Sequence, residues 1–365
     1  MKYVMLGNPE REELDIFHLI IAPTYDCNLT CKHCYNPTDG VHQNRISQEL
    51  SKEQWQGVIG RWADFVRKEG KDGIAHFKGG EPFFYKDLDK LLDYSAERGL
   101  WAFITSNGTL IGDKQAQHLG SLYRRTKGKV ILSLNGSTPK IDELLRQEGT
   151  YQKTVEASKR LRTNNVPFDI NYVTHSGNEE DVERAIYLGK KLGATQFNLL
   201  PLVERGSARA NGIGIPNLAK ILPQVDRARN NGAGNMLEWS VSDMIQRLGS
   251  GEYECNGCTA GFSGFAYITP EGNVYSCPNT VMEQHRLGTI DDSFEKIFDN
   301  ERTRGLREIH KGRLICKGEL KEYKAQPRSM KKVVDSEVVI KEKITETKTT
   351  SEDRKPIAIC FNRNW

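Results

Sequence analysis

Short apolar runs alternate with longer stretches of helical period between residues 16 and 201. The runs are rich in β-branched and aromatic residues, which is typical of buried strands. The predicted strands begin at Ile16, Ile74, Leu100, Val130, Phe168 and Gln196. Because helical stretches separate these runs, the chain repeats one strand–helix unit.

The stretch between the first two predicted strands has the clearest helical pattern. Its apolar side chains share one helical face, and they are Trp55, Val58, Ile59, Trp62, Phe65 and Val66. Ser51 and Gln54 fit a capping box, and Gly70 fits the end of the helix. Segments 87–99 and 178–193 also end in glycine before the next strand. Such repeats predict an α/β fold with a parallel sheet, either doubly wound or an incomplete barrel.

The alternation of predicted strands and helices ends at about residue 206. Residues 205–217 are rich in glycine and small side chains, and they are typical of a linker or a loop at the end of a barrel. From these changes we predict a first domain over 1–235, a small second domain over 236–316 and a charged tail over 317–365. The tail has too few apolar residues for a core, so we expect it to be mobile or to add as an edge strand.

Composition excludes several classes of protein. Of the 365 residues, 37% are hydrophobic and 27% are charged, and the net charge of +4 is too small to indicate a nucleic-acid partner. No apolar run approaches the ~20 residues that span a bilayer, and the N-terminus lacks the pattern of a signal peptide. We therefore expect a cytoplasmic protein without a membrane partner. In that reducing compartment, the eight cysteines are expected to bind metal or to act in catalysis.

Three of these cysteines, Cys27, Cys31 and Cys34, fall within eight positions directly after the first predicted strand. A structural zinc site needs four ligands, so three thiols leave it one short. A [4Fe–4S] cluster held by three thiolates keeps one iron open, and that iron can bind a substrate. In a barrel, the loop after a strand lies on the face where active sites form.

At this point the sequence resembles the radical S-adenosylmethionine (SAM) enzymes. Their signature has three residues between the first two cysteines and two before the third, with an aromatic just before it; here that position is His33. The resemblance covers roughly residues 14–316 and implies a partial (β/α)6 TIM-like barrel. It also implies SAM, a [4Fe–4S] cluster and an electron donor of the flavodoxin or ferredoxin type. The implied chemistry is cleavage of SAM to a 5′-deoxyadenosyl radical that takes a hydrogen atom from the substrate.

Further motifs follow the later strands in the order that this resemblance implies. The implied cofactor-binding residues are His33, Gly79, Gly80, Glu81, Pro82, Asn107, Ser133, Asn135 and Arg146. The two glycines would let the backbone approach the ligand, and Glu81 would meet its ammonium. Arg146 would lie near the carboxylate of the cofactor. The alternatives are buried structural thiols, ordinary turns, a packed His33 and a solvated Arg146.

A second group of cysteines follows in the second region. Residues 264–277 read as a β-hairpin around a Pro-Glu-Gly turn. Gly272 and Cys277 resemble the spacing in SPASM and Twitch regions, but the dense later cysteines of a full SPASM region are missing. The resemblance implies one auxiliary [4Fe–4S] cluster, with ligands Cys255, Cys258, Cys277 and Cys316. A four-cysteine zinc ribbon is the alternative.

Enzymes of this architecture include peptide maturases, sulfatase-maturing enzymes and the molybdenum-cofactor enzyme that acts on GTP. The basic double-glycine tail of the molybdenum-cofactor enzyme is absent, which argues against GTP as the substrate. Sulfatase-maturing enzymes typically use two auxiliary clusters, and this chain has ligands for only one. The resemblance therefore favours maturation of a ribosomally made peptide, with a cross-link through a cyclophane C–C bond or a thioether. Sulfatase-type oxidation of a side chain and a non-catalytic electron-transfer protein are the alternatives. Since only 26 residues precede Cys27, any leader-binding domain is expected to be a separate protein or to be dispensed with.

From Met330 onward the tail resembles a small precursor peptide with a charged leader and a short aromatic end. Such leaders commonly add a strand to a sheet edge. The tail is thus a candidate fused substrate, in which Phe361, Arg363 and Trp365 could be cross-linked. Cys360 could form a thioether instead. The alternative is a solvated tail.

Overall fold

The computed structural model describes most of the chain up to residue 304. The described residues are 7–8, 13–36, 49–202, 206–237, 263–281 and 283–304. The strands are β1 Gly7–Asn8, β2 Glu13–Ile21, β3 Asp72–Phe77, β4 Trp101–Ser106, β5 Gly128–Ser133, β6 Phe168–Thr174, β7 Phe197–Pro201, β8 Ser263–Ile268, β9 Asn273–Tyr275 and β10 Gly288–Thr289. The helices are α1 Lys52–Lys68, α2 Leu88–Glu97, α3 Asp113–Leu122, α4 Pro139–Asp142, α5 Thr150–Thr163, α6 Val182–Leu192, α7 Ser207–Ala210, α8 Leu218–Ala228 and α10 Phe294–Phe298.

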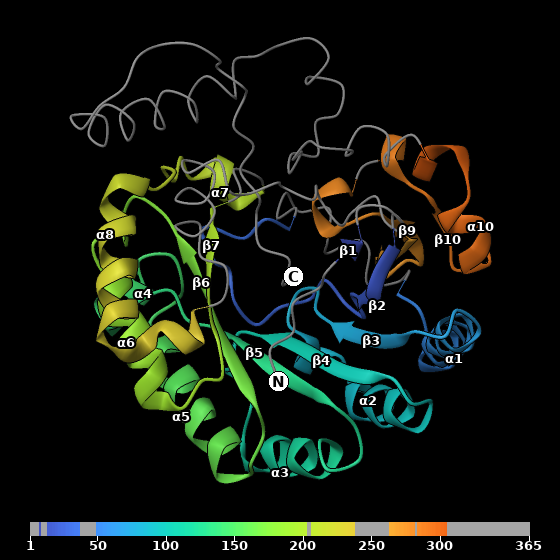
Figure 1. The fold of residues 1–365 in the computed structure, drawn as a ribbon, viewed down its shortest axis with the longest axis horizontal. Helices are drawn as coiled ribbons and strands as arrows, with labels where there is room; N and C mark the ends of the chain where they lie inside the picture. Colours follow the sequence, from blue (N-terminus) through green and yellow to red (C-terminus); the bar gives the residue numbers. More distant parts are fainter. Residues whose placement is uncertain are drawn as a thin grey trace.

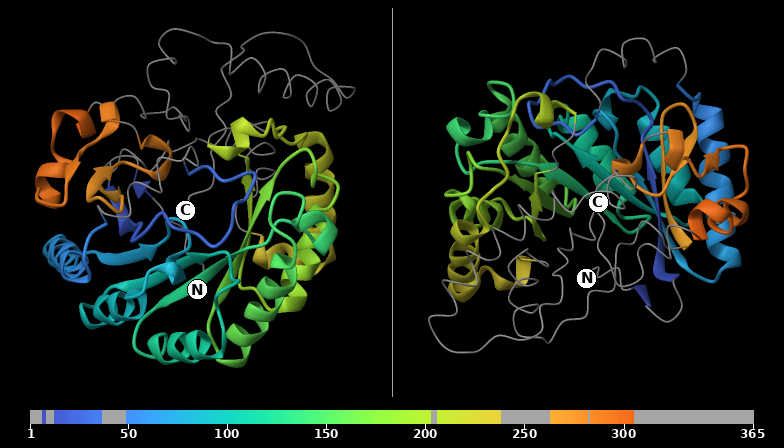
Figure 2. Two further views of the ribbon diagram at one scale, coloured as in Figure 1. Left: turned by 180° about the vertical axis from the view of Figure 1, so that it is seen from behind. Right: turned by 90° about the horizontal axis from the view of Figure 1, so that it is seen from above.

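Six parallel strands, β2 to β7, pair in the order in which they occur along the chain. The sheet is therefore not doubly wound, because that architecture reverses its strand order. Figures 1 and 2 show the strands curving around a central space with the helices on the outer side. The predicted partial barrel is confirmed, and all six predicted strands are present.

Helix α1 shows how the sequence determines this outer layer. Ser51 Oγ accepts a hydrogen bond from the backbone of Gln54, whose side chain accepts one from the Ser51 N–H, so the predicted capping box forms. The buried face includes Trp55 and Trp62, both fully buried. Trp62 also packs edge-on against Phe294 of α10, with ring centroids 4.9 Å apart. Helix α1 thus joins the barrel to the last described helix.

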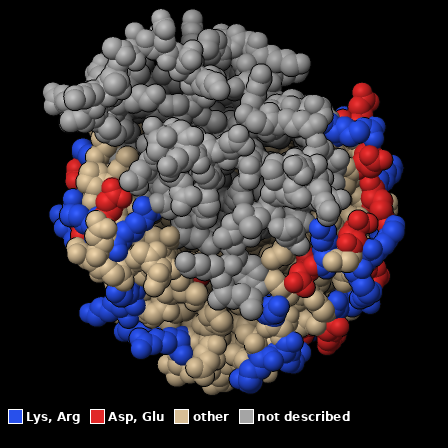
Figure 3. All heavy atoms as spheres, in the orientation of Figure 1, with Lys and Arg blue, Asp and Glu red and all other residues tan. Residues whose placement is uncertain are grey.

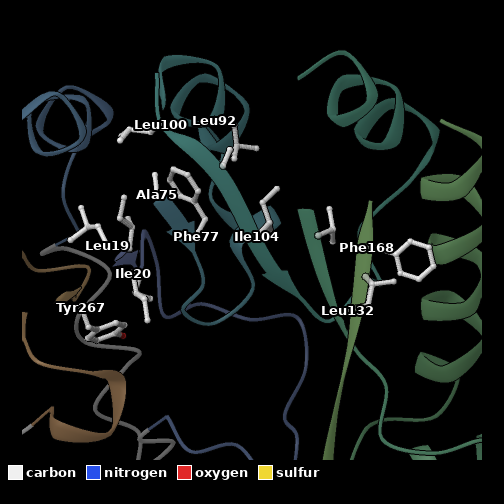
Figure 4. Close-up of a cluster of buried hydrophobic side chains, with 14 of the residues drawn as sticks. Leu19, Ile20, Ala75, Phe77, Leu92, Leu100, Ile104, Leu132, Phe168 and Tyr267 are labelled. Carbon is white, nitrogen blue, oxygen red and sulfur yellow. The ribbon is translucent and has the colours of Figure 1, made fainter. Parts of the chain in front are cut away.

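The core lies between the sheet and its helices. Figure 4 shows Leu19, Ala75 and Ile104 on neighbouring strands, with Leu92 of α2 packing toward them. A separate apolar cluster of Ile74, Trp101, Phe103 and Ile131 lies apart from this main core. These residues alternate along their strands with main-core residues, so they face the inside of the barrel.

The predicted hairpin over 264–277 is confirmed as β8 and β9, which pair antiparallel. The sequence did not indicate where this hairpin docks. Strand β8 runs parallel to β2, with Leu19 opposite Ala266, so it extends the barrel sheet on the side away from β3. Gly264 has φ +84°, and a Cβ there would lie 2.2 Å from the Phe17 ring. This close approach lets β8 lie against the first barrel strand.

The region after residue 206 contains more structure than the predicted linker. Helix α7 lies within it, and α8 follows directly. Asn217 caps α8 by accepting from the Ala219 N–H at 3.0 Å, and Arg227 pairs with Glu183 of α6 at 2.8 Å. Pro223 inside α8 obscured the helical pattern. Of the two predictions for residues 205–217, the loop at the end of the barrel agrees with the structure, and this loop contains the short helix α7.

No helix in the described part of the chain is long and apolar enough to cross a membrane. Figure 3 shows acidic and basic side chains around the rim of the face that is viewed. The predicted tail, including Cys360, Phe361, Arg363 and Trp365, lies outside the described residues.

Candidate active site at the cysteine loop

The cysteine loop, residues 22–36, follows β2 and lies at the carboxyl ends of the parallel strands. Two segments that come much later in the sequence hold its backbone. The Lys32 N–H donates to the Leu145 carbonyl at 2.8 Å, and the Ser207 N–H donates to the Cys34 carbonyl at 2.9 Å. Asn211 Nδ2 also donates to the Lys32 carbonyl at 3.2 Å. The loop is thus fixed between the α4–α5 connection and α7.

The Gly-Gly-Glu-Pro loop after β3 lies directly against the cysteine loop. The Gly80 N–H donates to the Thr24 carbonyl at 3.0 Å, and the Glu81 N–H donates to the Asp26 carbonyl at 2.8 Å. A Cβ on Gly80 would lie 2.1 Å from the Asp26 oxygen, and Gly79 has φ +127°. The glycines therefore let two loops of the protein approach each other, a role that the sequence did not reveal. Pro82 starts the short 3-10 turn that follows.

Glu81 is fully buried beneath this contact. Its carboxylate accepts from Ser106 Oγ at 2.8 Å, from the Asn107 N–H at 2.7 Å and from the Phe83 N–H at 3.2 Å. Burial raises the pKa of Glu81 to about 7 against the opposing effect of these donors. These bonds use three of the ~4 acceptor positions of a carboxylate, which leaves one for a ligand ammonium.

Two asparagines join later strands to the cysteine loop. Asn107, after β4, donates to Asn28 Oδ1 at 3.0 Å and lies 3.9 Å from the Cys27 sulfur. Asn135, after β5, contacts His33 Nε2 at 3.3 Å through its Nδ2. Burial lowers the pKa of His33 to about 4, so its ring is neutral at pH 7. Both motif asparagines thus contact the cysteine loop.

Arg146 is buried in the wall of the site, and its guanidinium connects several site elements. It donates to the Ser133 carbonyl at 2.7 Å and to the Asn107 carbonyl at 2.8 Å, and it pairs with buried Asp142 at 3.4 Å. It also forms a hydrogen bond with the Cys31 thiol, an effect that lowers the thiol pKa. Arg146 is therefore not a solvated helix residue. Its contacts to two strand ends and to the cysteine loop suit a positioning role.

The three thiols of the loop lie near one another but do not converge on one point. Cys27 is exposed, whereas Cys31 and Cys34 are partly buried. Burial raises the pKa of each thiol to about 11, so the thiolates form only when a cation compensates for the burial. Nowhere in the described residues does a group of three His, Cys, Asp or Glu side chains converge to hold one metal ion. The loop offers three thiols, the number that holds three irons of a [4Fe–4S] cluster and leaves the fourth iron open.

Cys277 ends the β8–β9 hairpin and is the one predicted auxiliary ligand among the described residues; Cys255, Cys258 and Cys316 lie outside them. It is 7% exposed, and its N–H donates to Thr280 Oγ1 at 3.2 Å. Its thiol acts electrostatically on Lys78 and on Tyr35, the residue after Cys34. The hairpin therefore brings Cys277 toward the cysteine loop.

Sequence reasoning missed the residues between Cys277 and the cysteine loop. Lys78 Nζ lies 5.5 Å from the centre of the Tyr35 ring, and the Tyr267 hydroxyl donates to the Tyr25 hydroxyl at 3.0 Å. Burial lowers the pKa of Lys78 to about 8, so it is mostly protonated at pH 7. Their positions in the sequence could have indicated them, because Lys78 directly precedes the Gly-Gly-Glu-Pro motif and Tyr35 directly follows Cys34.

A parallel barrel with three separated thiols and a glycine loop at its mouth is the framework of an iron–sulfur enzyme. The chain carries a radical SAM domain, because the model of the radical SAM superfamily matches residues 21–188. An iron-sulfur cluster-binding domain of the SPASM family matches residues 255–318. The enzyme therefore uses SAM, a radical SAM cluster and an auxiliary iron–sulfur cluster.

Named relatives and solved structures agree with this assignment. A PqqA peptide cyclase of Streptomyces rochei is 25% identical over 268 residues, which are 71% of this chain and 68% of that protein. The PqqA peptide cyclase of Xanthomonas campestris pv. campestris (strain 8004) is 25% identical over 304 residues, 80% of this chain and 72% of that protein. SuiB of Streptococcus suis bound to SAM has a TM-score of 0.63 at 17% identity, covering 82% of this chain and 69% of SuiB. Native anSMEcpe with bound AdoMet has a TM-score of 0.61 at 20% identity, and the match covers 80% of this chain and 82% of anSMEcpe.

Proposed function

We propose that this enzyme modifies a ribosomally made peptide by hydrogen-atom abstraction and joins two of its side chains through a C–C or thioether bond. The observation that carries the proposal is the similarity to two PqqA peptide cyclases, which extends over 71% and 80% of the chain. The contact between the Gly-Gly-Glu-Pro loop and the cysteine loop supports it, because it assembles a SAM site at the barrel mouth.

The proposed roles follow the contacts of each residue. Cys27, Cys31 and Cys34 hold the radical SAM cluster, and Cys255, Cys258, Cys277 and Cys316 hold the auxiliary cluster. Glu81 accepts from the cofactor ammonium through its remaining acceptor position. Arg146 acts near the cofactor carboxylate by fixing Ser133 and Asn107. His33 and Asn135 line the same side of the mouth, and Gly79, Gly80 and Pro82 shape the loop.

When bound, the cluster and SAM supply a carbon-centred radical that removes a hydrogen atom from the peptide. The atoms balance when SAM and two peptide C–H or S–H groups become methionine, 5′-deoxyadenosine, one proton and the cross-linked peptide. The chain contributes a buried apolar cluster that includes Trp101 and Phe103. We place the entry of the substrate on the side of the cysteine loop.

The remaining partners belong to the same proposal. We assign the enzyme to the cytoplasm, with an electron donor of the flavodoxin or ferredoxin type and a discrete leader-binding protein. The substrate is a separate precursor peptide or the chain's own tail with Phe361, Arg363 and Trp365.

We divide the chain into a barrel over 1–235, an auxiliary-cluster domain over 236–316 and a tail over 317–365. Oxidation of a protein side chain, as in sulfatase maturation, is the second candidate, which the resemblance of the sequence leaves open.

The test uses the full chain, reconstituted without oxygen and incubated with SAM and dithionite. Mass spectrometry of the C-terminal fragment and of added candidate precursor peptides should detect the loss of two hydrogens. A Cys31→Ala variant should form neither product nor 5′-deoxyadenosine. If the wild type forms no 5′-deoxyadenosine, the enzyme proposal fails. If it forms 5′-deoxyadenosine but converts a residue such as serine or cysteine to an aldehyde instead of cross-linking, the second candidate replaces the first.

A further inference from the structure

Two asparagine side chains bond to each other on the inner face of the barrel. Asn171 of β6 and Asn198 of β7 are partners in the register of these neighbouring strands (Figure 1), and Asn198 Nδ2 donates to Asn171 Oδ1 at 2.9 Å. The residues on either side of each asparagine belong to the main core between the sheet and its helices, and they are Ile170, Tyr172, Phe197 and Leu199. Because side chains alternate along a strand, both asparagines point to the inside of the barrel.

The bond between the two asparagines leaves hydrogen-bonding groups unused in both side chains. Asn198 is fully buried, and within the described part of the chain its Oδ1 accepts no hydrogen bond. Asn171 is 7% exposed, and no described residue accepts from its Nδ2. The pair therefore presents one donor and one acceptor side by side. Exchanging the nitrogen and the oxygen in both amides leaves one of each again.

Unpaired polar groups in a buried place are costly, and two apolar residues of the same shape avoid that cost. The register of β6 and β7 does not depend on this pair, because the apolar residues on either side of each asparagine already fix which face of each strand is buried. The two amides thus call for an explanation other than folding. A ligand that brings its own donor and acceptor supplies one.

The pair lies next to the wall of the proposed SAM site. Asn171 is opposite Ser133 in the register of β5 and β6, and the Ser133 carbonyl accepts from Arg146. Since neighbouring strands are ~4.8 Å apart, the Cα atoms of Asn171 and Asn198 lie about 5 and 10 Å from that of Ser133. Two residues beyond Asn171, the Val173 N–H donates at 2.9 Å to the side chain that contacts His33. A group bound to the pair would therefore lie beside the cofactor.

We propose that Asn171 and Asn198 bind an amide of the substrate peptide, either a main-chain amide or the carboxamide of an asparagine or glutamine. The inference rests on the proposed peptide substrate and deepens it. An amide carries both an N–H and a C=O, so it satisfies the unused acceptor and the unused donor of the pair together. The bound amide fixes the peptide against the barrel wall, and this selects which of its hydrogens faces the radical.

The test compares the reconstituted full chain with two double variants, Asn171→Leu/Asn198→Leu and Asn171→Val/Asn198→Val. The control is Asn235→Leu at an exposed position. The probe is the peptide that the wild type modifies, either a synthetic copy of residues 330–365 or the added precursor peptide. Anaerobic kinetics give KM and kcat for the probe, equilibrium dialysis gives the Kd for SAM, and thermal unfolding gives the melting temperature.

We expect the KM for the probe to rise about tenfold or more in both double variants, because two hydrogen bonds are lost. The Kd for SAM should not change, and the melting temperature should equal or exceed that of the wild type, since unpaired polar groups have been removed. The control should match the wild type in every measurement.

Three results would overturn the proposal. An unchanged KM in a folded double variant would mean that the pair holds only water. A Kd for SAM that rises as much as the KM would assign the pair to the cofactor. Melting temperatures more than about 4 °C below the wild type in both double variants would assign it to the fold.

Two series of probe peptides distinguish the sources of the amide. N-methylation blocks one main-chain N–H at a time, and exchange of each asparagine or glutamine for leucine removes one carboxamide. The change that removes the bound amide should raise the KM of the wild type but not that of the double variants, and the absence of any such change would also overturn the proposal.

Failure of the proposed function gives a different result from failure of this inference. If the wild type modifies no peptide, the proposed function fails, and the role of the asparagines falls with it. If the wild type modifies the probe and the double variants do so with the same KM, only the role of the asparagines is wrong.

Discussion

Replacing Gly80 with alanine tests whether the contact between the two mouth loops assembles the site. The new Cβ would lie 2.1 Å from the Asp26 oxygen and 2.4 Å from the Tyr25 oxygen, both backbone atoms that cannot rotate away. Relief of this clash separates the loops and breaks the hydrogen bonds from Gly80 to Thr24 and from Glu81 to Asp26. Each bond contributes about 0.5–1.5 kcal/mol, and each donor left buried costs about 1–3 kcal/mol. Because two donors lose their acceptors, we expect a total loss of about 2–6 kcal/mol.

Two measurements check this expectation. Anaerobic urea unfolding of the metal-free protein gives the change in the free energy of unfolding. Iron analysis after reconstitution should fall by about four irons per chain, as expected for the loss of one [4Fe–4S] cluster. The matched control is Gly57→Ala in α1, where the nearest atom to the new Cβ is an arginine side-chain nitrogen at 3.5 Å. That change should be neutral or stabilising, because alanine favours a helix by ~1 kcal/mol over glycine. A Gly80→Ala protein with wild-type iron and stability within ~0.5 kcal/mol would refute the reasoning.

Three further predictions concern other parts of the molecule. Arg146→Lys should destabilise the protein by about 2–3 kcal/mol, because one ammonium cannot reproduce the contacts to Ser133, Asn107 and Asp142. Thermal unfolding checks this, and Arg162→Lys, at an exposed position of α5, should change little. Trp62→Ala should lower the free energy of unfolding, measured with urea, by about 3–5 kcal/mol, since it leaves a cavity between α1 and α10. A variant as stable as the wild type would contradict this, because Phe294 and Phe298 would then have filled the cavity. The carboxylates of Asp89 and Asp93, which pair with its ring nitrogens at 3.3 and 3.1 Å, raise the pKa of His118. This contribution to stability is complete below about pH 6.5 and is lost as pH rises through the higher folded pKa. Melting temperatures of the wild type and His118→Gln should therefore differ more at pH 6 than at pH 9, and a constant difference would contradict this sign.

The sequence predicted the local elements well, because each depends on neighbouring residues. The apolar runs and the Ser51–Gln54 capping box sufficed for the strands and α1. Helix α8 was missed because Pro223 lies inside it and its buried face forms only against α6. The pairing of β8 with β2 joins residues far apart in sequence, and no local pattern encodes such a contact.

For the site, too, the sequence predicted the individual motifs but not the contacts between distant segments. Spacing placed the thiols, the glycine loop and the asparagines in one region, and the structure brings them together. Spacing did not reveal that Gly80 packs against Asp26, or that Lys78 lies over the Tyr35 ring. Cys255, Cys258, Cys316 and the tail lie outside the described residues, so their roles stay predictions.

The pairing of β8 with β2 has a consequence for how the chain folds during synthesis. Leu19, Ile20 and Ile21 lie opposite Ala266, Tyr267 and Ile268, which the ribosome produces about 250 residues later. Until then, one edge of an apolar strand has no partner, and such edges favour aggregation. A truncation before residue 263 should therefore be less soluble than the full chain, although it contains every strand from β2 to β7. The barrel can close its first edge only after the second cysteine region has been made.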